Sequence, residues 1–247
     1  LTGNELGLLL GWRAAERERI RAAAQDRTPR GALACTIVSS PALGAVAREY
    51  GLSYAETLSG FKWVSRVPDL LFGFEEALGY LTHPAIVRDK DGISASADAI
   101  AMARECAADG RTVWDLLDDA SARFGHFASG QVTLRLPSMA AATTLSERVR
   151  SNPPQEFAGT PVARTLDLLT PGAAEIPANV LRFDLEDGSR IMIRPSGTEP
   201  KLKVYIDTFS DRGDVSERRA AAERALADLE TAVRDTLLNA QSDAPTR

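Results

Sequence analysis

Four side chains that can bind an anion lie in the bend of "RIMIRPSGTEPKLKVYIDT", residues 190–208, between two strand-like runs. Two prolines and a glycine suffice to turn the chain, so the turn itself does not need a guanidinium, two hydroxyls and an ammonium. These groups belong to Arg194, Ser196, Thr198 and Lys201. Together with the N–H groups of the bend, they predict a phosphate-binding loop. The alternative interpretation is a hairpin with ordinary surface charges.

Two other lysines are candidates for the same chemistry. Lys203 follows Lys201 by two residues, so both lie on one face of a strand, and the sequence does not decide which of them serves the loop. Lys62 lies between two aromatic residues in "TLSGFKWV", where it can meet a phosphate or have a lowered pKa. A surface lysine with its stem on apolar neighbours is the more frequent case.

Two carboxylates, Glu75 and Glu76, follow an apolar run in "LLFGFEEALGYL". The end of a strand in an α/β sheet places side chains in the crevice that usually holds ligands, where carboxylates can accept hydrogen bonds from sugar hydroxyls. The alternative is the acidic first turn of a helix, which the helix dipole favours without any ligand. The acidic "RDKDGI" lacks the further positions of a calcium loop and indicates a helix start.

The elements that position these groups change in kind along the chain. The first half predicts a βαβ unit from a strand at 33–38, a helix at 43–50 and a strand at 53–57, and adds helices at 92–108 and 113–124. The second half predicts a strand at 131–136 and a helix at 139–149. Four further strands, with a hairpin at Asp187-Gly188, and a final helix at about 215–238 follow. We therefore expect a βαβ-type mixed-sheet α/β domain, followed by an α+β domain whose antiparallel sheet has helices on one side.

Composition excludes several classes of function. The 247 residues carry a net charge of -5, which argues against a nucleic-acid surface. No apolar run is long enough to span a membrane. Two cysteines and two histidines without zinc-ligand spacing predict reduced, packed thiols and a cytoplasmic protein.

Several of these segments resemble one known family. "RPSGTEPKLKVYI" is similar to the phosphate-binding signature in the last domain of the α-D-phosphohexomutases, the superfamily of phosphoglucomutases and phosphomannomutases. "TLSGFKW", "FGFEEALGY" and "VRDKDG" occur in the order and approximate spacing of that family's third domain, and "LTGNELGLLL" looks like the segment just beyond its metal-binding loop. The resemblance covers nearly the whole chain. It implies three parts: residues 1–28 from the end of the preceding domain, an α/β sugar-recognition domain at 29–127, and a phosphate-binding domain at 128–247.

The resemblance also implies roles for individual residues. Arg194, Ser196, Gly197 and Thr198 would clamp the substrate phosphate that is not being transferred, with Lys201 beside them. Glu75 matches the family's sugar-contacting glutamate, and Glu76 is its neighbour. Where the family often has "EES", this chain has Ala77 in the serine position, which puts one sugar hydrogen bond in doubt. Lys62 and Lys90 fall in matching segments and would line the cleft, where they would support catalysis through charge balance or proton transfer.

The resemblance further implies what lies outside this chain. The family interconverts hexose 1-phosphate and hexose 6-phosphate through an enzyme phosphoserine, a hexose 1,6-bisphosphate intermediate and Mg²⁺. Its phosphoserine loop, of the type "TASHNP", and its magnesium loop, of the type "DGDADR", do not occur here. We therefore expect a C-terminal fragment of a cytoplasmic mutase for glucose or mannose phosphates, inactive alone, without catalytic or metal residues of its own and completed by missing N-terminal domains. The alternatives are a phosphopentomutase of the same superfamily and a non-catalytic phosphosugar-binding module.

Overall fold

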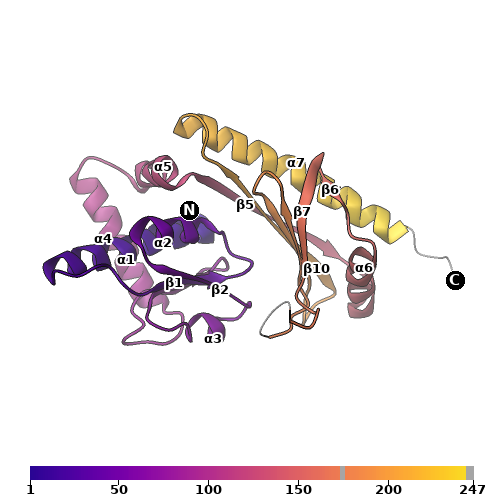
Figure 1. Cartoon of the computed structure of the whole chain (residues 1–247), viewed down its shortest axis with the longest axis horizontal. Coiled ribbons are helices and arrows are strands. Elements are labelled where there is room, and N and C mark those ends of the chain that lie inside the picture. Colours follow the sequence, from indigo (N-terminus) through magenta and orange to yellow (C-terminus); the bar gives the residue numbers. More distant parts are fainter. Residues whose placement is uncertain (173–175, 243–247) are drawn as a thin grey trace. The chain divides into compact units, whose positions relative to one another are not determined.

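The computed structural model describes residues 1–172 and 176–242 of the chain (Figure 1). Its contacts divide the chain into two compact units. Unit 1 comprises residues 1–127 and 211–215, and unit 2 comprises residues 128–210 and the chain from residue 216 onward. None of the helices among the described residues is long and apolar enough to cross a membrane.

Unit 1 is built on a four-stranded sheet in the order β2-β1-β3-β4. β1 pairs in parallel with β2 and β3, whereas β4 is antiparallel to β3. The predicted βαβ unit and mixed sheet are thereby confirmed, because α2 connects two parallel strands. In chain order the elements are α1 (Gly3–Ala24), β1 (Ala32–Thr36), α2 (Ala42–Tyr50), β2 (Ser53–Thr57), α3 (Phe61–Val64), β3 (Leu70–Glu75), β4 (Gly79–Leu81), α4 (Gly92–Ala108) and α5 (Val113–Phe124).

Helix α1 packs inside unit 1, on α2 and β3. A capping box starts it, because Glu5 N–H donates to Thr2 Oγ1 and Thr2 N–H donates to the Glu5 carboxylate. An added Cβ at Gly7 would lie 2.5 Å from the Phe74 ring, so the absence of a side chain permits this close approach. The sequence-based division gives residues 1–28 to a preceding domain; in the structure α1 shares the core of unit 1.

The two faces of the sheet in unit 1 have separate apolar clusters. Leu33, Phe72 and Phe74 pack with residues of α1 and α2 on one face. Ala34 and Leu70 pack with α3 on the other. Leu33 and Ala34 are neighbours in β1 and point to opposite faces, so this strand serves both clusters. A register shift between β1 and β3 after Leu70 accounts for Leu70 and Phe72 lying on different faces. The carboxyl ends of the parallel strands β1, β2 and β3 meet at one edge.

Unit 2 is a six-stranded sheet in the order β5-β10-β9-β8-β7-β6 with two helices. The pairings of β6 to β7, β7 to β8, β8 to β9 and β9 to β10 are antiparallel, as predicted. In chain order the elements are β5 (His126–Arg135), α6 (Met139–Ser151), β6 (Glu156–Phe157), β7 (Thr160–Asp167), β8 (Leu181–Leu185), β9 (Arg190–Pro195), β10 (Lys201–Ser210) and α7 (Val215–Ser242).

Alternation along the strands of unit 2 separates an apolar face from a charged face. Ile191, Ile193 and Val204 belong to the core that also contains residues of α6 and α7. Figure 1 shows the long helix α7 running beside the sheet. The alternate residues include Arg190 and Asp207, a buried ion pair with 2.7 Å between Nε and Oδ2. The sheet therefore has its helices on one side, in agreement with the prediction.

Strand β6 ends the sheet of unit 2 on one side and is only two residues long. Pro153 and Pro154 precede it, and Pro161 lies in its neighbour β7. Proline cannot donate a hydrogen bond to another strand, which explains why pairing stops here.

Candidate functional site

The bend between β9 and β10 is held at its two ends and open in the middle. Ser196 N–H donates to the Lys201 carbonyl at 2.8 Å, and Leu136 N–H donates to the Pro200 carbonyl at 2.9 Å. An added Cβ at Gly197 would have no described atom within 4 Å, and the Gly197 N–H has no acceptor among the described residues. An exposed N–H in a fixed bend is a suitable donor to an anion.

Arg194 and Lys203 face each other beside this bend. They are register partners in the β9–β10 ladder and both are half-buried. Like charges directly opposite one another destabilise a sheet, and a bound anion offsets that repulsion. Neither side chain has an ion-pair partner among the described residues. The sequence does not decide whether Lys201 or Lys203 serves the loop. In the structure it is Lys203 that lies opposite Arg194.

Lys201 is placed differently, although it was predicted as part of the loop. Its Nζ lies 2.7 Å from Glu199 Oε1, and this hydrogen bond lowers the pKa of Glu199. The positive charges of Arg135 and Lys203 act on the same carboxylate in the same direction. Sequence reasoning missed Arg135, which lies at the end of β5. Only the pairing of β5 with β10 brings it near, and no local signal in the sequence predicts that pairing.

Glu75 and Lys90, predicted from separate segments of unit 1, lie together. Glu75 ends β3, and its Oε2 lies 3.3 Å from Lys90 Nζ. The ammonium also lies 5.7 Å from the centre of the Phe61 ring. The Glu75 side chain is 18% exposed and that of Lys90 57%, so the pair is open to solvent on the lysine side.

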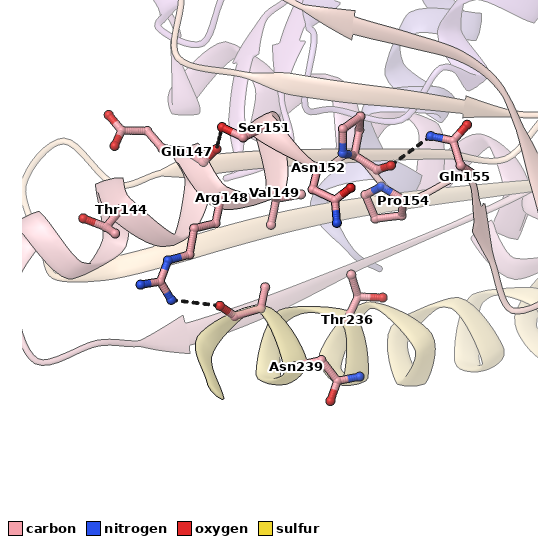
Figure 2. Close-up of a pocket in the computed structure, with 12 residues that line it drawn as sticks. Thr144, Glu147, Arg148, Val149, Ser151, Asn152, Pro154, Gln155, Thr236 and Asn239 are labelled. Atoms are coloured by element: carbon pink, nitrogen blue, oxygen red, sulfur yellow. Dashed lines mark hydrogen bonds between the residues drawn. The ribbon is translucent and has the colours of Figure 1, made fainter. Parts of the chain in front are cut away.

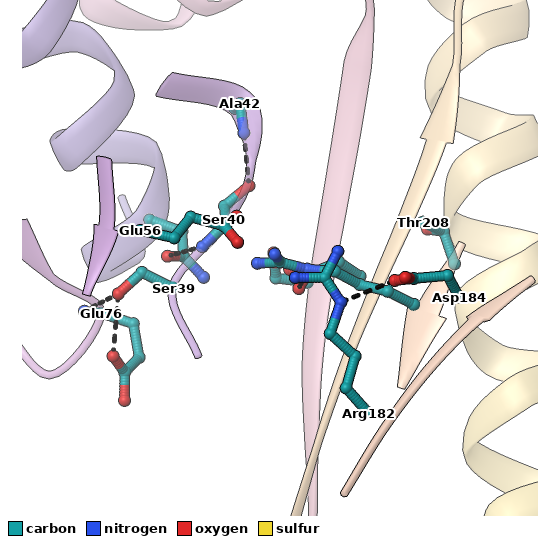
Figure 3. Close-up of polar contacts among 12 residues, drawn as sticks. Ser39, Ser40, Ala42, Glu56, Glu76, Arg182, Asp184 and Thr208 are labelled. Atoms are coloured by element: carbon teal, nitrogen blue, oxygen red, sulfur yellow. Dashed lines mark hydrogen bonds and ion pairs between the residues drawn. The ribbon is translucent and has the colours of Figure 1, made fainter. Parts of the chain in front are cut away.

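The side chain of Glu76 is hydrogen-bonded to Ser39, in the loop after β1 (Figure 3). Its Oε2 accepts hydrogen bonds from Ser39 Oγ at 3.0 Å and from Thr36 Oγ1 at 3.3 Å. Its own N–H donates to Ser39 Oγ at 3.0 Å. Both hydroxyl residues are buried. The two neighbouring glutamates thus have different surroundings.

Lys62 is exposed on the short helix α3, with its Nζ 5.0 Å from the centre of the Trp63 ring. Among the described residues it makes no ion pair, and no contact joins it to Glu75 or Lys90. The structure therefore brings Glu75 and Lys90 together in unit 1 and the loop residues together in unit 2. It does not bring Lys62 into either cluster.

A cavity of about 790 Å³ lies in unit 2 and involves none of the predicted residues (Figure 2). The second half of α6, the two prolines that follow it and the end of α7 line this cavity. Arg148 spans the cavity, donating to the carbonyl of Ala240 at 3.1 Å. The other polar groups that line the cavity are mostly exposed hydroxyls and amides.

The residues present do not fit a magnesium site. Across residues 1–172 and 176–242, no group of three or more His, Cys, Asp or Glu side chains is arranged to hold a metal ion. Mg²⁺ requires oxygen ligands in octahedral arrangement, usually including carboxylates.

Comparison with known families gives two matches in the expected order. Residues 2–124 match "Phosphoglucomutase/phosphomannomutase, alpha/beta/alpha domain III", and residues 147–226 match "Phosphoglucomutase/phosphomannomutase, C-terminal domain". The chain belongs to the phosphoglucomutase/phosphomannomutase family. The resemblance inferred from the loop and the two glutamates is confirmed at the level of the family.

Two relatives within this family show how much of a longer protein the chain represents. A Haemophilus influenzae protein named "Probable phosphomannomutase" is 41% identical over 96% of this chain, which spans 45% of that relative. A Staphylococcus aureus phosphoglucomutase is 30% identical over 83% of the chain, which spans 39% of it. The chain therefore spans less than half the length of these relatives.

Solved structures of the same family share the fold. The phosphoglucomutase parafusin from Paramecium, in an open form, gives a TM-score of 0.64 at 20% identity, covering 95% of this chain and 42% of parafusin. A family member from Burkholderia thailandensis gives 0.62 at 15% identity, covering 99% of this chain and 43% of that protein. At these identities the likeness concerns fold alone.

Proposed function

We propose that this chain recognises the sugar and the phosphate of a hexose phosphate within a longer mutase that interconverts hexose 1-phosphate and hexose 6-phosphate. The observation that carries the proposal is the pair of facing cations, Arg194 and Lys203, beside the open N–H of Gly197. The names of the two relatives support a glucose or mannose phosphate as substrate.

In this proposal the bend in unit 2 clamps the phosphate that is not being transferred. The guanidinium of Arg194 donates to two phosphate oxygens, because its planar fork matches the spacing of those oxygens. Ser196 and Thr198 donate from their hydroxyls and Gly197 from its N–H. Lys203 adds positive charge, and Lys201 contributes less because Glu199 already neutralises it.

Glu75 orients the sugar in the same proposal. A carboxylate that accepts hydrogen bonds from two adjacent hydroxyls holds the ring without selecting the end that carries phosphate. Lys90 holds that carboxylate in place through its ion pair. Lys62 makes no ion pair among the described residues and is an exposed lysine that an incoming phosphate can reach.

The chemical step would take place on residues outside this chain. In the proposed reaction a phosphoserine transfers its phosphoryl group to the free hydroxyl of the sugar phosphate, giving a bisphosphate. After the sugar has turned, the serine takes back the other phosphoryl group. This chain holds the sugar and the second phosphate during both transfers and is inactive alone.

We propose residues 29–127 as the sugar-recognition domain and residues 128–247 as the phosphate-binding domain. We also propose a cytoplasmic location, which the two free cysteines support.

Calorimetric titration of the chain tests the proposal. Glucose 1-phosphate, mannose 1-phosphate, ribose 1-phosphate and inorganic phosphate are compared, with unphosphorylated glucose as control. Hexose phosphates should bind more tightly than inorganic phosphate, and glucose should not bind. Tighter binding of ribose 1-phosphate would favour a pentose mutase, and equal affinity for all phosphates would overturn recognition of the sugar.

A further inference from the structure

Glu76 and its neighbours form a connection between three segments at one edge of the sheet in unit 1. Glu76 follows β3, the buried hydroxyl of Thr36 is at the end of β1, and that of Ser39 lies in the loop after it. Thr36 Oγ1 and Ser39 Oγ also lie 2.7 Å apart, so the single proton of the Thr36 hydroxyl goes either to Ser39 or to Glu76. No cation pairs with Glu76 among the described residues, so the hydroxyls are the donors that hold its carboxylate.

The start of α1 closes the same cluster. An added Cβ at Gly3 would lie 1.9 Å from the Glu76 carbonyl oxygen, so the helix and the turn are in direct contact. Asn4 Oδ1 accepts from the N–H of Ser40 at 2.9 Å, and the hydroxyl of Tyr80 donates to the Gly3 carbonyl at 3.0 Å. The turn after β3 is therefore fixed from both sides.

The turn that Glu76 begins is strained. Glu75 and Gly79 are register partners, which leaves a three-residue connection between β3 and β4. Its last residue, Leu78, has φ of 62° and a side chain that is 68% exposed. A leucine is unfavourable in the left-handed region, and such a conformation persists only where the surroundings impose it.

We propose that Glu76 is a positioning residue, which with Thr36 and Ser39 holds the strained turn so that Glu75 presents its carboxylate to the sugar. Glu76 then does not itself contact the sugar. This inference rests on the proposed function, because it assigns a task to Glu75. Its physical basis is separate, since the hydrogen bonds of Glu76 exist without ligand.

The test uses four variants of the chain: Ser39→Ala, Glu76→Ala, their combination, and Glu76→Gln. A control, Ser96→Ala, makes the same change at an exposed site on α4. The first readout is hydrogen exchange at the N–H of Glu76 without ligand. Exchange should be faster in Ser39→Ala, which removes the acceptor, and unchanged in Ser96→Ala. Unchanged exchange in Ser39→Ala would overturn the role of Ser39 in holding the turn.

The second readout is the affinity for mannose 1-phosphate divided by the affinity for inorganic phosphate. Ser39→Ala and Glu76→Ala should each lower this ratio about tenfold, the effect of losing one hydrogen bond to a charged group. The double variant should have the same affinity ratio as either single variant, because Ser39 and Glu76 act through one connection. Glu76→Gln, which keeps an acceptor oxygen, should stay close to the wild type.

The outcomes separate this inference from the proposed function. Suppose that the ratio of the two affinities is as high in Ser39→Ala as in the wild type but is lowered in both Glu76→Ala and Glu76→Gln. Glu76 would then contact the sugar directly, and the positioning role would be overturned. Faster exchange of the Glu76 N–H in Ser39→Ala, with an unchanged affinity for mannose 1-phosphate in every variant, would overturn the positioning role as well. A wild-type protein that does not distinguish mannose 1-phosphate from inorganic phosphate would overturn the proposed function, whatever the exchange rates show.

Discussion

Lys203 lies directly opposite Arg194 in the pairing of β10 with β9. Their neighbours Ile193 and Val204 point to the other face, where they share a core with α6 and α7. The backbone pairing of β9 with β10 therefore places the Cα atoms of the two cationic residues opposite each other before any ligand arrives. Such preorganisation lowers the cost of binding an anion between them.

Replacing Lys203 with alanine should weaken affinity for inorganic phosphate about tenfold, because a charged donor to the anion is lost. Lys201→Ala should have a smaller effect, since its ammonium is already paired with Glu199. Titration calorimetry at fixed ionic strength measures both. Arg224→Ala removes one positive charge from an exposed position on α7 and serves as control. A larger loss in Lys201→Ala would reverse the assignment of the two lysines.

Arg194→Ala should weaken affinity for inorganic phosphate and for mannose 1-phosphate equally, by about 10- to 100-fold, because both ligands lose the same charge-assisted contact. Arg194→Lys keeps the charge and loses the planar fork, so it should recover only part of the affinity. Binding within twofold of the wild type in Arg194→Ala would remove this residue from the site.

Glu75→Gln should weaken binding of mannose 1-phosphate and leave the affinity for inorganic phosphate unchanged. The reason is that the carboxylate meets sugar hydroxyls and not the phosphate. Competition between the two ligands in one titration measures the difference directly. If both affinities fell together, Glu75 would be supporting the structure of unit 1 and not selecting the sugar.

Glu18 should make the stability of unit 1 depend on acid pH. The hydrogen bond from Arg27, at 2.6 Å, lowers the pKa of this buried carboxyl below its ordinary value near 4.5. A carboxyl whose pKa is lowered by folding stabilises the native state above its unfolded-state pKa, and that contribution disappears as the pH falls through the native-state pKa. Glu18→Gln should therefore lose about 1.5–3 kcal/mol of unfolding free energy at pH 7. The loss should shrink on acidification.

Urea unfolding followed by tryptophan fluorescence can measure this, because Trp12, Trp63 and Trp114 all lie in unit 1. Asp109→Asn changes an exposed carboxyl in the same unit and is the control. Parallel curves of stability against pH for the wild type and Glu18→Gln would contradict the prediction.

Much of the fold follows from local patterns in the sequence. The helix predicted at 92–108 is α4, and the one predicted at 113–124 is α5, because Asp91 and Thr112 cap their first turns with hydrogen bonds to backbone N–H groups. The βαβ unit and the hairpin at Asp187-Gly188 are equally local. Strand β4 and helix α3 were not predicted, since three and four residues are too short for a periodicity to show.

The candidate site divides in the same way. Residues of one bend, such as Arg194 and Ser196, are close in sequence, so their proximity in space can be predicted without knowledge of the tertiary structure. The contacts of Glu75 with Lys90 and of Glu76 with Ser39 cross separations of 15 and 37 residues. Only the order of strands in the sheet and the turn geometry determine them. The roles of these residues remain predictions for the experiments above.

The short strand β6 has a consequence for the behaviour of unit 2 in solution. An exposed sheet edge can pair with the edge of another molecule and start aggregation. Here the last strand has two residues, two prolines lie before it, and another proline lies in the neighbouring strand. Strand β6 itself therefore presents few free N–H groups to an incoming strand. Removing these prolines should therefore make the protein more prone to form intermolecular β-structure.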